Sequence, residues 1–221
     1  MPEARIELEL DDGALDAFVA CPDGPGRKRP ILLLSRRNEP AERVESWVRR
    51  LSAHNYFVLA PVLSGLSADD RREAAWACLD HLADERRVDD SRVGTLGFGS
   101  GADLALALAA GRAERIAAVA AYGARGFRGQ TALEISQKIN GLVRLGYALN
   151  AVPARAGLFE AALNLSGVLF DIEIYEGEPR WPDLLDFFGR GLAASAGEDG
   201  RGTNLARHAL NPGETGVTHL R

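Results

Sequence analysis

Short, continuous apolar runs alternate along this chain with longer segments whose apolar residues recur at helical spacing. Each apolar run predicts a strand buried on both faces, and the runs span 31–34, 56–60, 92–98, 116–122 and 141–147. The segments between them predict helices over 42–54, 69–86 and 102–108. Strands and helices that alternate in this way favour an α/β fold, in which a mostly parallel, twisted sheet carries helices on both faces.

The two ends of this pattern add further elements. Residues 6–10 and 15–20 flank Asp11-Asp12-Gly13, and Asp-Gly between short apolar runs predicts an N-terminal β-hairpin. The C-terminal part predicts a helix from Pro153 to about residue 165, an alternating edge strand and a final helix, the last two over 170–175 and 182–192. We expect one α/β domain over residues 1–193, followed by a polar tail over 194–221 that is rich in Gly, Asn, Thr and charge.

Composition narrows the class of protein. The chain has 221 residues, of which 46% are hydrophobic and 26% charged, as in ordinary globular proteins. A net charge of −5 argues against nucleic acid or an anionic membrane as partner. No apolar run approaches the roughly 18 residues of a membrane span, and no signal-peptide pattern opens the chain, so we expect a cytoplasmic protein. Cys21, Cys78 and the four histidines show no metal-binding or redox spacing, so we expect neither metal nor cofactor.

The segment Gly97-Phe98-Gly99-Ser100-Gly101 separates a predicted strand from a helix of small residues. A strand, a sharp glycine-rich turn and a helix form the nucleophile elbow of hydrolytic enzymes, in which the middle residue of Gly-x-Ser-x-Gly carries the attacking atom. The flanking glycines fix the frame, and the middle position falls on Gly99. Glycine has no side chain, so this elbow lacks a nucleophile.

Several segments, in order, resemble the dienelactone hydrolase family, a compact branch of the α/β-hydrolase superfamily. The resemblance covers about residues 6–192 and is carried by 12–20, 51–61, 88–98 and 120–123. These segments resemble the first hairpin of the family, its helix-to-strand passage before an Ala-Pro turn, the approach to its elbow and the strand end that follows. The resemblance implies an α/β-hydrolase fold.

The reactive positions of the family do not carry over to this chain. Its Cys or Ser nucleophile aligns with Gly99, its acid with Leu149, and its histidine with Arg180. Arginine stays protonated and cannot act as a base, and leucine cannot orient one. Because a triad needs a nucleophile, a base and an acid, three losses together imply a degenerate active site without the usual hydrolytic route.

A binding role remains open for such a site. The helix after Gly99 directs its N-terminal N–H groups towards the predicted pocket, and arginine suits a carboxylate. We therefore expect a small organic anion or a lactone-like ligand, with binding residues Ser35, Arg36, Ser100, Tyr122, Arg180 and Trp181. Arg37 is expected at the same mouth. In the competing interpretation these arginines are solvated or paired with Glu39, Glu176 and Glu178.

Three alternatives accompany ligand binding. One is a triad-independent reaction such as a cyclisation or an isomerisation, supported by an oxyanion-type donor. Another is a protein partner that binds the tail over 194–221. The third is an ester or lactone hydrolase with rearranged groups, in which Ser100 or Ser35 attacks and a tail histidine, His208 or His219, is the base.

The sequence favours another role for Ser100. If Ser100 were the nucleophile, Phe98 and Ala102 would lie two residues before and after it. Close packing of the strand against the helix requires small residues at both positions, and Phe98 is large. Ser100 is better suited to be an oxyanion donor through its N–H, with a hydroxyl that caps the following helix. His54 and His81 are interpreted as surface or capping residues.

Overall fold

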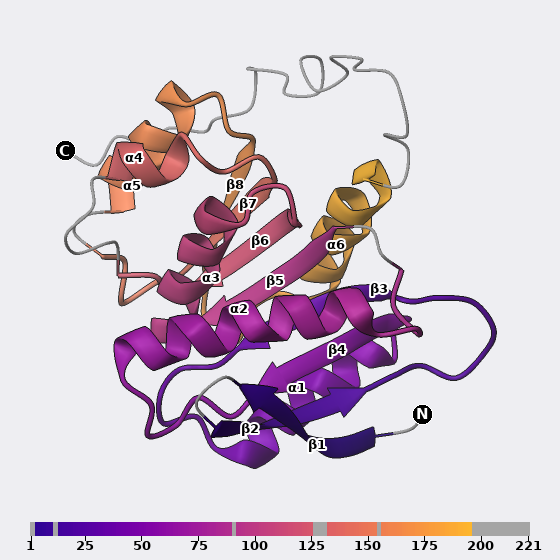
Figure 1. The fold of residues 1–221 in the computed structure, drawn as a ribbon. Helices are drawn as coiled ribbons and strands as arrows, with labels where there is room; N and C mark the ends of the chain where they lie inside the picture. The colour runs from indigo at the N-terminus through magenta and orange to yellow at the C-terminus, as the bar shows by residue number, and fades with distance from the viewer. Residues whose placement is uncertain (1–2, 11–12, 90–91, 126–131, 154–155, 196–221) are drawn as a thin grey trace, which may run out of the picture.

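A computed structural model describes residues 3–10, 13–89, 92–125, 132–153 and 156–195 of the chain. Eight strands form one sheet in the order β1-β2-β4-β3-β5-β6-β7-β8 (Figure 1). β1 pairs with β2, and β2 with β4, in antiparallel fashion, and the other neighbours are parallel. The strands are β1 Glu3–Leu10, β2 Gly13–Ala20, β3 Arg29–Leu34, β4 Tyr56–Pro61, β5 Val93–Phe98, β6 Ile116–Tyr122, β7 Leu142–Ala148 and β8 Phe170–Tyr175.

Helices cover both faces of the sheet (Figure 1). They are α1 Ala41–Ser52, α2 Ala68–Asp84, α3 Ser100–Gly111, α4 Ala132–Ser136, α5 Ala156–Leu165 and α6 Trp181–Ser195. One core lies between the sheet and α2, α3, α4 and α5, and the other between the sheet and α1 and α6. Every residue of β4, β5 and β6 is buried, because a strand covered on both faces needs apolar residues on both.

The predicted fold class is confirmed, including the N-terminal hairpin of β1 and β2, which pair from Glu3–Ala20 to Leu10–Gly13. β8 lies at the end of the sheet, as its alternating pattern predicts. The short helix α4 has no counterpart in the predicted elements. The helix expected from Pro153 is described from Ala156, since residues 154 and 155 lie outside the described ranges.

Two further expectations concern the chain as a whole. None of the helices in the described ranges combines the length and apolar character that a bilayer-spanning helix needs. Residues 196–221, most of the predicted tail and both of its histidines, lie outside the described residues. The division into a domain over 1–193 and a tail over 194–221 therefore stays a prediction.

Candidate functional site

The candidate site is the turn between β5 and α3, which Gly99 forms by itself. β5 ends at Phe98 and α3 begins at Ser100, so the chain changes from strand to helix within one residue. Gly99 has φ 55° and ψ −117°, a combination that residues with side chains seldom adopt and that marks strained turns. Its N–H donates to the carbonyl oxygen of Tyr122 over 2.8 Å, which anchors the turn to the end of β6.

Two flanking glycines let α3 lie close to the sheet. A Cβ atom on Gly97 would overlap the carbonyl oxygen of Gly101, and one on Gly101 would overlap the carbonyl oxygen of Leu34. Neither position accepts a larger residue unless α3 moves away from β3 and β5. This tight packing is what a nucleophile elbow requires two residues before and two after its centre, and Gly99 is the residue at that centre.

The stem of Arg36 lies over Gly99. A Cβ atom on Gly99 would come within 3.2 Å of Cβ and 3.9 Å of Cδ of Arg36. The Arg36 guanidinium is paired with Glu39, with Nε 2.6 Å from Oε2, and the Glu39 side chain is only 2% exposed. The charge of Arg36 is thus neutralised by Glu39. This agrees with the competing interpretation, in which the arginines pair with nearby glutamates.

Ser100 turns its hydroxyl towards the loop that follows β3. Its Oγ accepts hydrogen bonds from the N–H of Arg37 and from Nη1 of Arg71, each over 3.2 Å. The N-cap of α3 is Gly99, and no side chain caps this helix. The expectation that the Ser100 hydroxyl caps the helix is therefore wrong, because Ser100 is already the first helical residue and the cap position belongs to the glycine before it.

Arg71 is a residue of this site that the sequence interpretation missed. It lies in the first turns of α2, is 7% exposed, and donates from Nη2 to the carbonyl oxygen of the buried Ser35 over 3.2 Å. The missed signal is its position on α2, three residues before Ala74 and seven before Cys78, both of which are buried. An arginine at helical spacing with core residues lies on the buried face.

A second polar contact crosses the carboxyl ends of β6, β7 and β8. Tyr122, Gly146 and Glu173 are paired in one row of the sheet. The Tyr122 hydroxyl donates to Oε2 of Glu173 over 2.7 Å, and the N–H of Arg180 donates to Oε1 of the same carboxylate over 2.7 Å. Both side chains are buried, and burial raises the pKa of Tyr122 well above its usual value. Glu173 is also a residue that the sequence interpretation missed.

Comparison with models of known protein families identifies the family of this chain. A model of the dienelactone hydrolase family matches residues 62–179, more than half of the chain. The chain belongs to the dienelactone hydrolase family. The match contains the elbow around Gly99 and the segment around Leu149, and it ends one residue before Arg180.

Three solved structures of low sequence identity share the fold of this chain. A Klebsiella pneumoniae protein described as a dienelactone hydrolase is 16% identical, with a TM-score of 0.72 over 86% of this chain and 98% of that chain. The Pyrococcus furiosus esterase Pf2001 is 14% identical, with a TM-score of 0.69 over 86% and 93%. Acylaminoacyl peptidase of Pyrococcus horikoshii is 12% identical, with a TM-score of 0.71 over 91% and 43%. A search of the curated proteins found no match.

The residues that the sequence analysis aligns with the acid and the base of the family, Leu149 and Arg180, follow the carboxyl ends of β7 and β8. Leu149 is 59% exposed, and it lines a hollow of about 210 Å³ together with Tyr175 and Gly177. The Arg180 side chain is 72% exposed and pairs with Asp183, with Nη1 3.2 Å from Oδ2. Arg180 therefore directs its charge towards solvent, while its backbone holds Glu173.

Apart from Arg180, whose side chain is exposed, the expected binding residues divide into two groups. Ser35, Arg36 and Ser100 surround Gly99 through the contacts described above. The side chains of Tyr122 and Trp181 are 1% and 4% exposed and belong to the core beneath α6. The guanidinium carbon of Arg50 lies over the Trp181 ring, 4.7 Å from the ring centroid. The structure thus brings the first group together at the elbow and holds the aromatic pair within the core.

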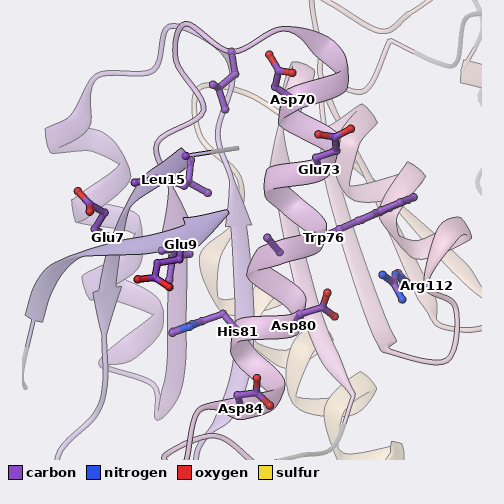
Figure 2. A pocket seen from close by; sticks show the side chains of 15 residues that line it. Glu7, Glu9, Leu15, Asp70, Glu73, Trp76, Asp80, His81, Asp84 and Arg112 are labelled. Atoms are coloured by element: carbon purple, nitrogen blue, oxygen red, sulfur yellow. The ribbon is translucent and has the colours of Figure 1, made fainter. Parts of the chain in front are cut away.

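The two described histidines lie on other parts of the surface. His54 is exposed, and its Nδ1 is hydrogen-bonded to the carbonyl oxygen of Arg50 at the end of α1 over 2.9 Å. His81 lines a hollow of about 1150 Å³ between α2 and the β1–β2 hairpin (Figure 2). The hydrogen-bond partners of Ser100 Oγ within the described ranges are Arg37 and Arg71. His208 and His219 lie outside those ranges.

Proposed function

We propose that this member of the dienelactone hydrolase family is a degenerate enzyme that no longer hydrolyses esters or lactones and binds a small organic anion at its elbow. The observation that carries the proposal is the absence of any side chain on Gly99, the residue at the centre of the strained turn. A hydrolase of this fold places its attacking atom there. The positions aligned with the acid and the base, Leu149 and Arg180, offer no groups for those roles.

The surroundings of Ser100 support the loss of hydrolysis. A serine attacks only when a base accepts its proton. Both neighbours of Ser100 Oγ are donors, since one is a backbone N–H and the other a guanidinium. Neither accepts a proton at ordinary pH. A rearranged hydrolase that uses Ser100 or Ser35 would need a histidine from the tail, and it remains the alternative function.

Retention of the elbow's shape supports a binding role. α3 is a helix of twelve residues that begins at the elbow, and the first N–H groups of a helix attract anions. Gly97 and Gly101 keep α3 in close contact with the sheet, which preserves this N-terminus in its place. Oxyanion-type donors of this kind also suit a cyclisation or an isomerisation of the bound anion, and a protein partner for the tail over 194–221 remains part of the proposal.

The test compares ester and lactone hydrolysis by the full-length chain and by Ser100→Ala and Ser35→Ala. We expect each protein to release product from p-nitrophenyl acetate and from a dihydrocoumarin lactone no faster than an equal mass of the same protein after heat denaturation. Turnover by the wild-type chain that one of the two substitutions abolishes would establish the rearranged hydrolase and overturn the proposal.

A further inference from the structure

Arg71 is a buried cation that forms no ion pair with any residue the structure describes. The residue is 7% exposed, and its two described partners, Ser100 Oγ and the carbonyl oxygen of Ser35, are both neutral. No carboxylate of the described residues lies within ion-pair distance of its guanidinium. Removing an arginine from water without a compensating anion costs free energy, so the position of Arg71 calls for an explanation.

The neighbouring charges make this position less favourable. Arg37 donates its N–H to the same Ser100 Oγ and its guanidinium to the carbonyl oxygen of Leu66, and it also forms no ion pair with a described residue. Burial and the positive charge of Arg37 lower the pKa of Arg71. Ser100 is the first residue of α3, so the positive end of the helix dipole adds to the same field.

Three other arginines of the fold, two beyond the carboxyl ends of β3 and β8 and one within β7, are each neutralised. Arg36 is paired with Glu39, Arg144 with Asp171, and Arg180 with Asp183. Arg144 is 8% exposed, about as buried as Arg71, and it nevertheless has its carboxylate at 2.9 Å. Of these arginines, Arg71 and Arg37 are the two for which no carboxylate of a described residue lies within ion-pair distance.

We propose that Arg71 and Arg37 hold the oxyanion end of a small organic ligand, a carboxylate or a phosphate ester, beside the hydroxyl of Ser100. This inference rests on the proposed function, because it names the anchor of the ligand bound at the elbow. Planar, polydentate guanidinium groups suit both oxyanions. The bound oxyanion supplies the negative charge that the protein itself does not place there.

The test uses the full-length chain, Arg71→Met and Arg72→Met. Methionine retains much of the apolar stem of arginine and removes its charge. Arg72 is the matched control, because it neighbours Arg71 on α2, has a 48% exposed side chain and is paired with Asp69. Thermal unfolding and calorimetric titration are measured with benzoate, phenyl phosphate and inorganic phosphate at constant ionic strength.

We expect benzoate or phenyl phosphate to raise Tm of the wild-type chain and of Arg72→Met by roughly 5 °C at about 100 times Kd. Arg71→Met loses this shift and, without ligand, unfolds at the same temperature as the wild-type chain or above it, because a buried charge has been removed. Arg37→Met weakens binding about tenfold, which checks the site independently of how Arg71→Met folds.

Equal Tm shifts in the wild-type chain and Arg71→Met would overturn the inference. So would a shift with inorganic phosphate alone, since that would indicate an inorganic anion site, and so would the absence of any shift. These outcomes are independent of the hydrolysis assay. A chain that binds anions through Arg71 and also hydrolyses esters refutes only the loss of activity. An inactive chain whose Arg71→Met variant keeps the wild-type shift refutes only the anchor, and an inactive chain without any shift refutes the anchor and the anion binding but leaves the loss of activity standing.

Discussion

The hydroxyl of Tyr122 donates a 2.7 Å hydrogen bond to Oε2 of Glu173 from two strands away. Gly146 lies between them in the same row of the sheet, and a Cβ atom there would overlap the Tyr122 ring. The glycine thus leaves the space through which the tyrosine contacts the carboxylate, which in turn holds the N–H of Arg180. This contact ties the end of β6 to the segment that follows β8.

Removal of the Tyr122 hydroxyl should destabilise the fold. Tyr122→Phe leaves Oε2 of a buried carboxylate without its donor, and we expect the free energy of unfolding to fall by about 1–3 kcal/mol. Tyr175→Phe is the matched control, since Tyr175 is a neighbouring, half-buried ring and its change should stay within about 0.5 kcal/mol. Urea denaturation measures both, and an equal loss in the two variants would contradict the role of the contact.

Gly146 should tolerate alanine poorly. The methyl group of Gly146→Ala would overlap the Tyr122 ring, and overpacking of this kind costs about 1–3 kcal/mol. Gly157→Ala provides the contrast, because it lies in α5 with no atom near the added carbon and alanine favours a helix. Thermal unfolding should show a lower Tm for the first variant and an unchanged or higher one for the second. The reverse order would contradict the steric explanation.

Restoring a hydroxyl at the elbow should not restore activity. Gly99→Ser places a side chain at φ 55° and against the stem of Arg36, and we expect a loss of about 1–3 kcal/mol from the strained backbone. Gly26→Ser, at φ 83° in open space, isolates the cost of positive φ from that of the Arg36 contact. Hydrolysis of p-nitrophenyl acetate by Gly99→Ser should equal that of the wild-type chain, because none of the described residues that contact the elbow is a base for the new hydroxyl. A large gain in rate would show that a base is present.

The four buried or half-buried tyrosines should make the fold less stable at alkaline pH. Burial raises the pKa of all four, Tyr56, Tyr122, Tyr147 and Tyr175, above the ordinary value of 10.0, and that of Tyr147 to about 12. Below pH 10 both the folded and the unfolded chain keep these protons. Above it the unfolded chain loses protons that the folded chain retains, so the free energy of unfolding falls. Tyrosinate absorbance should rise together with loss of the circular dichroism signal, and ionisation well before unfolding would contradict the prediction.

Much of the fold follows from periodicity. Continuous apolar runs identify β3 to β7 because each is covered on both faces, and the alternation of Phe170 to Tyr175 identifies β8 as an edge strand. α4 has only five residues, too few for a helical period to stand out from a loop. The elbow is found from the spacing of Gly97, Gly99 and Gly101, because backbone packing alone requires glycine at the outer two.

The partners of the elbow residues depend on tertiary contacts. Tyr122 and Trp181 are expected at the site from the sequence, whereas both side chains are buried in the core between the sheet and α6. Glu173 is the buried member of an otherwise half-exposed strand, and its donors come from residues 51 and 7 positions away in sequence. Ser100 contacts Arg37 and Arg71 because β3, α2 and α3 meet at the elbow.

The central claim, that the elbow holds no nucleophile, is tested most directly by intact-mass spectrometry of the full-length chain after prolonged incubation with excess fluorophosphonate. This reagent reacts covalently with activated serines. We expect an unchanged mass, because Gly99 has no attacking atom and the described partners of Ser100 Oγ only donate. Stoichiometric addition of one phosphonyl group, abolished in Ser100→Ala or in Ser35→Ala, would contradict the claim.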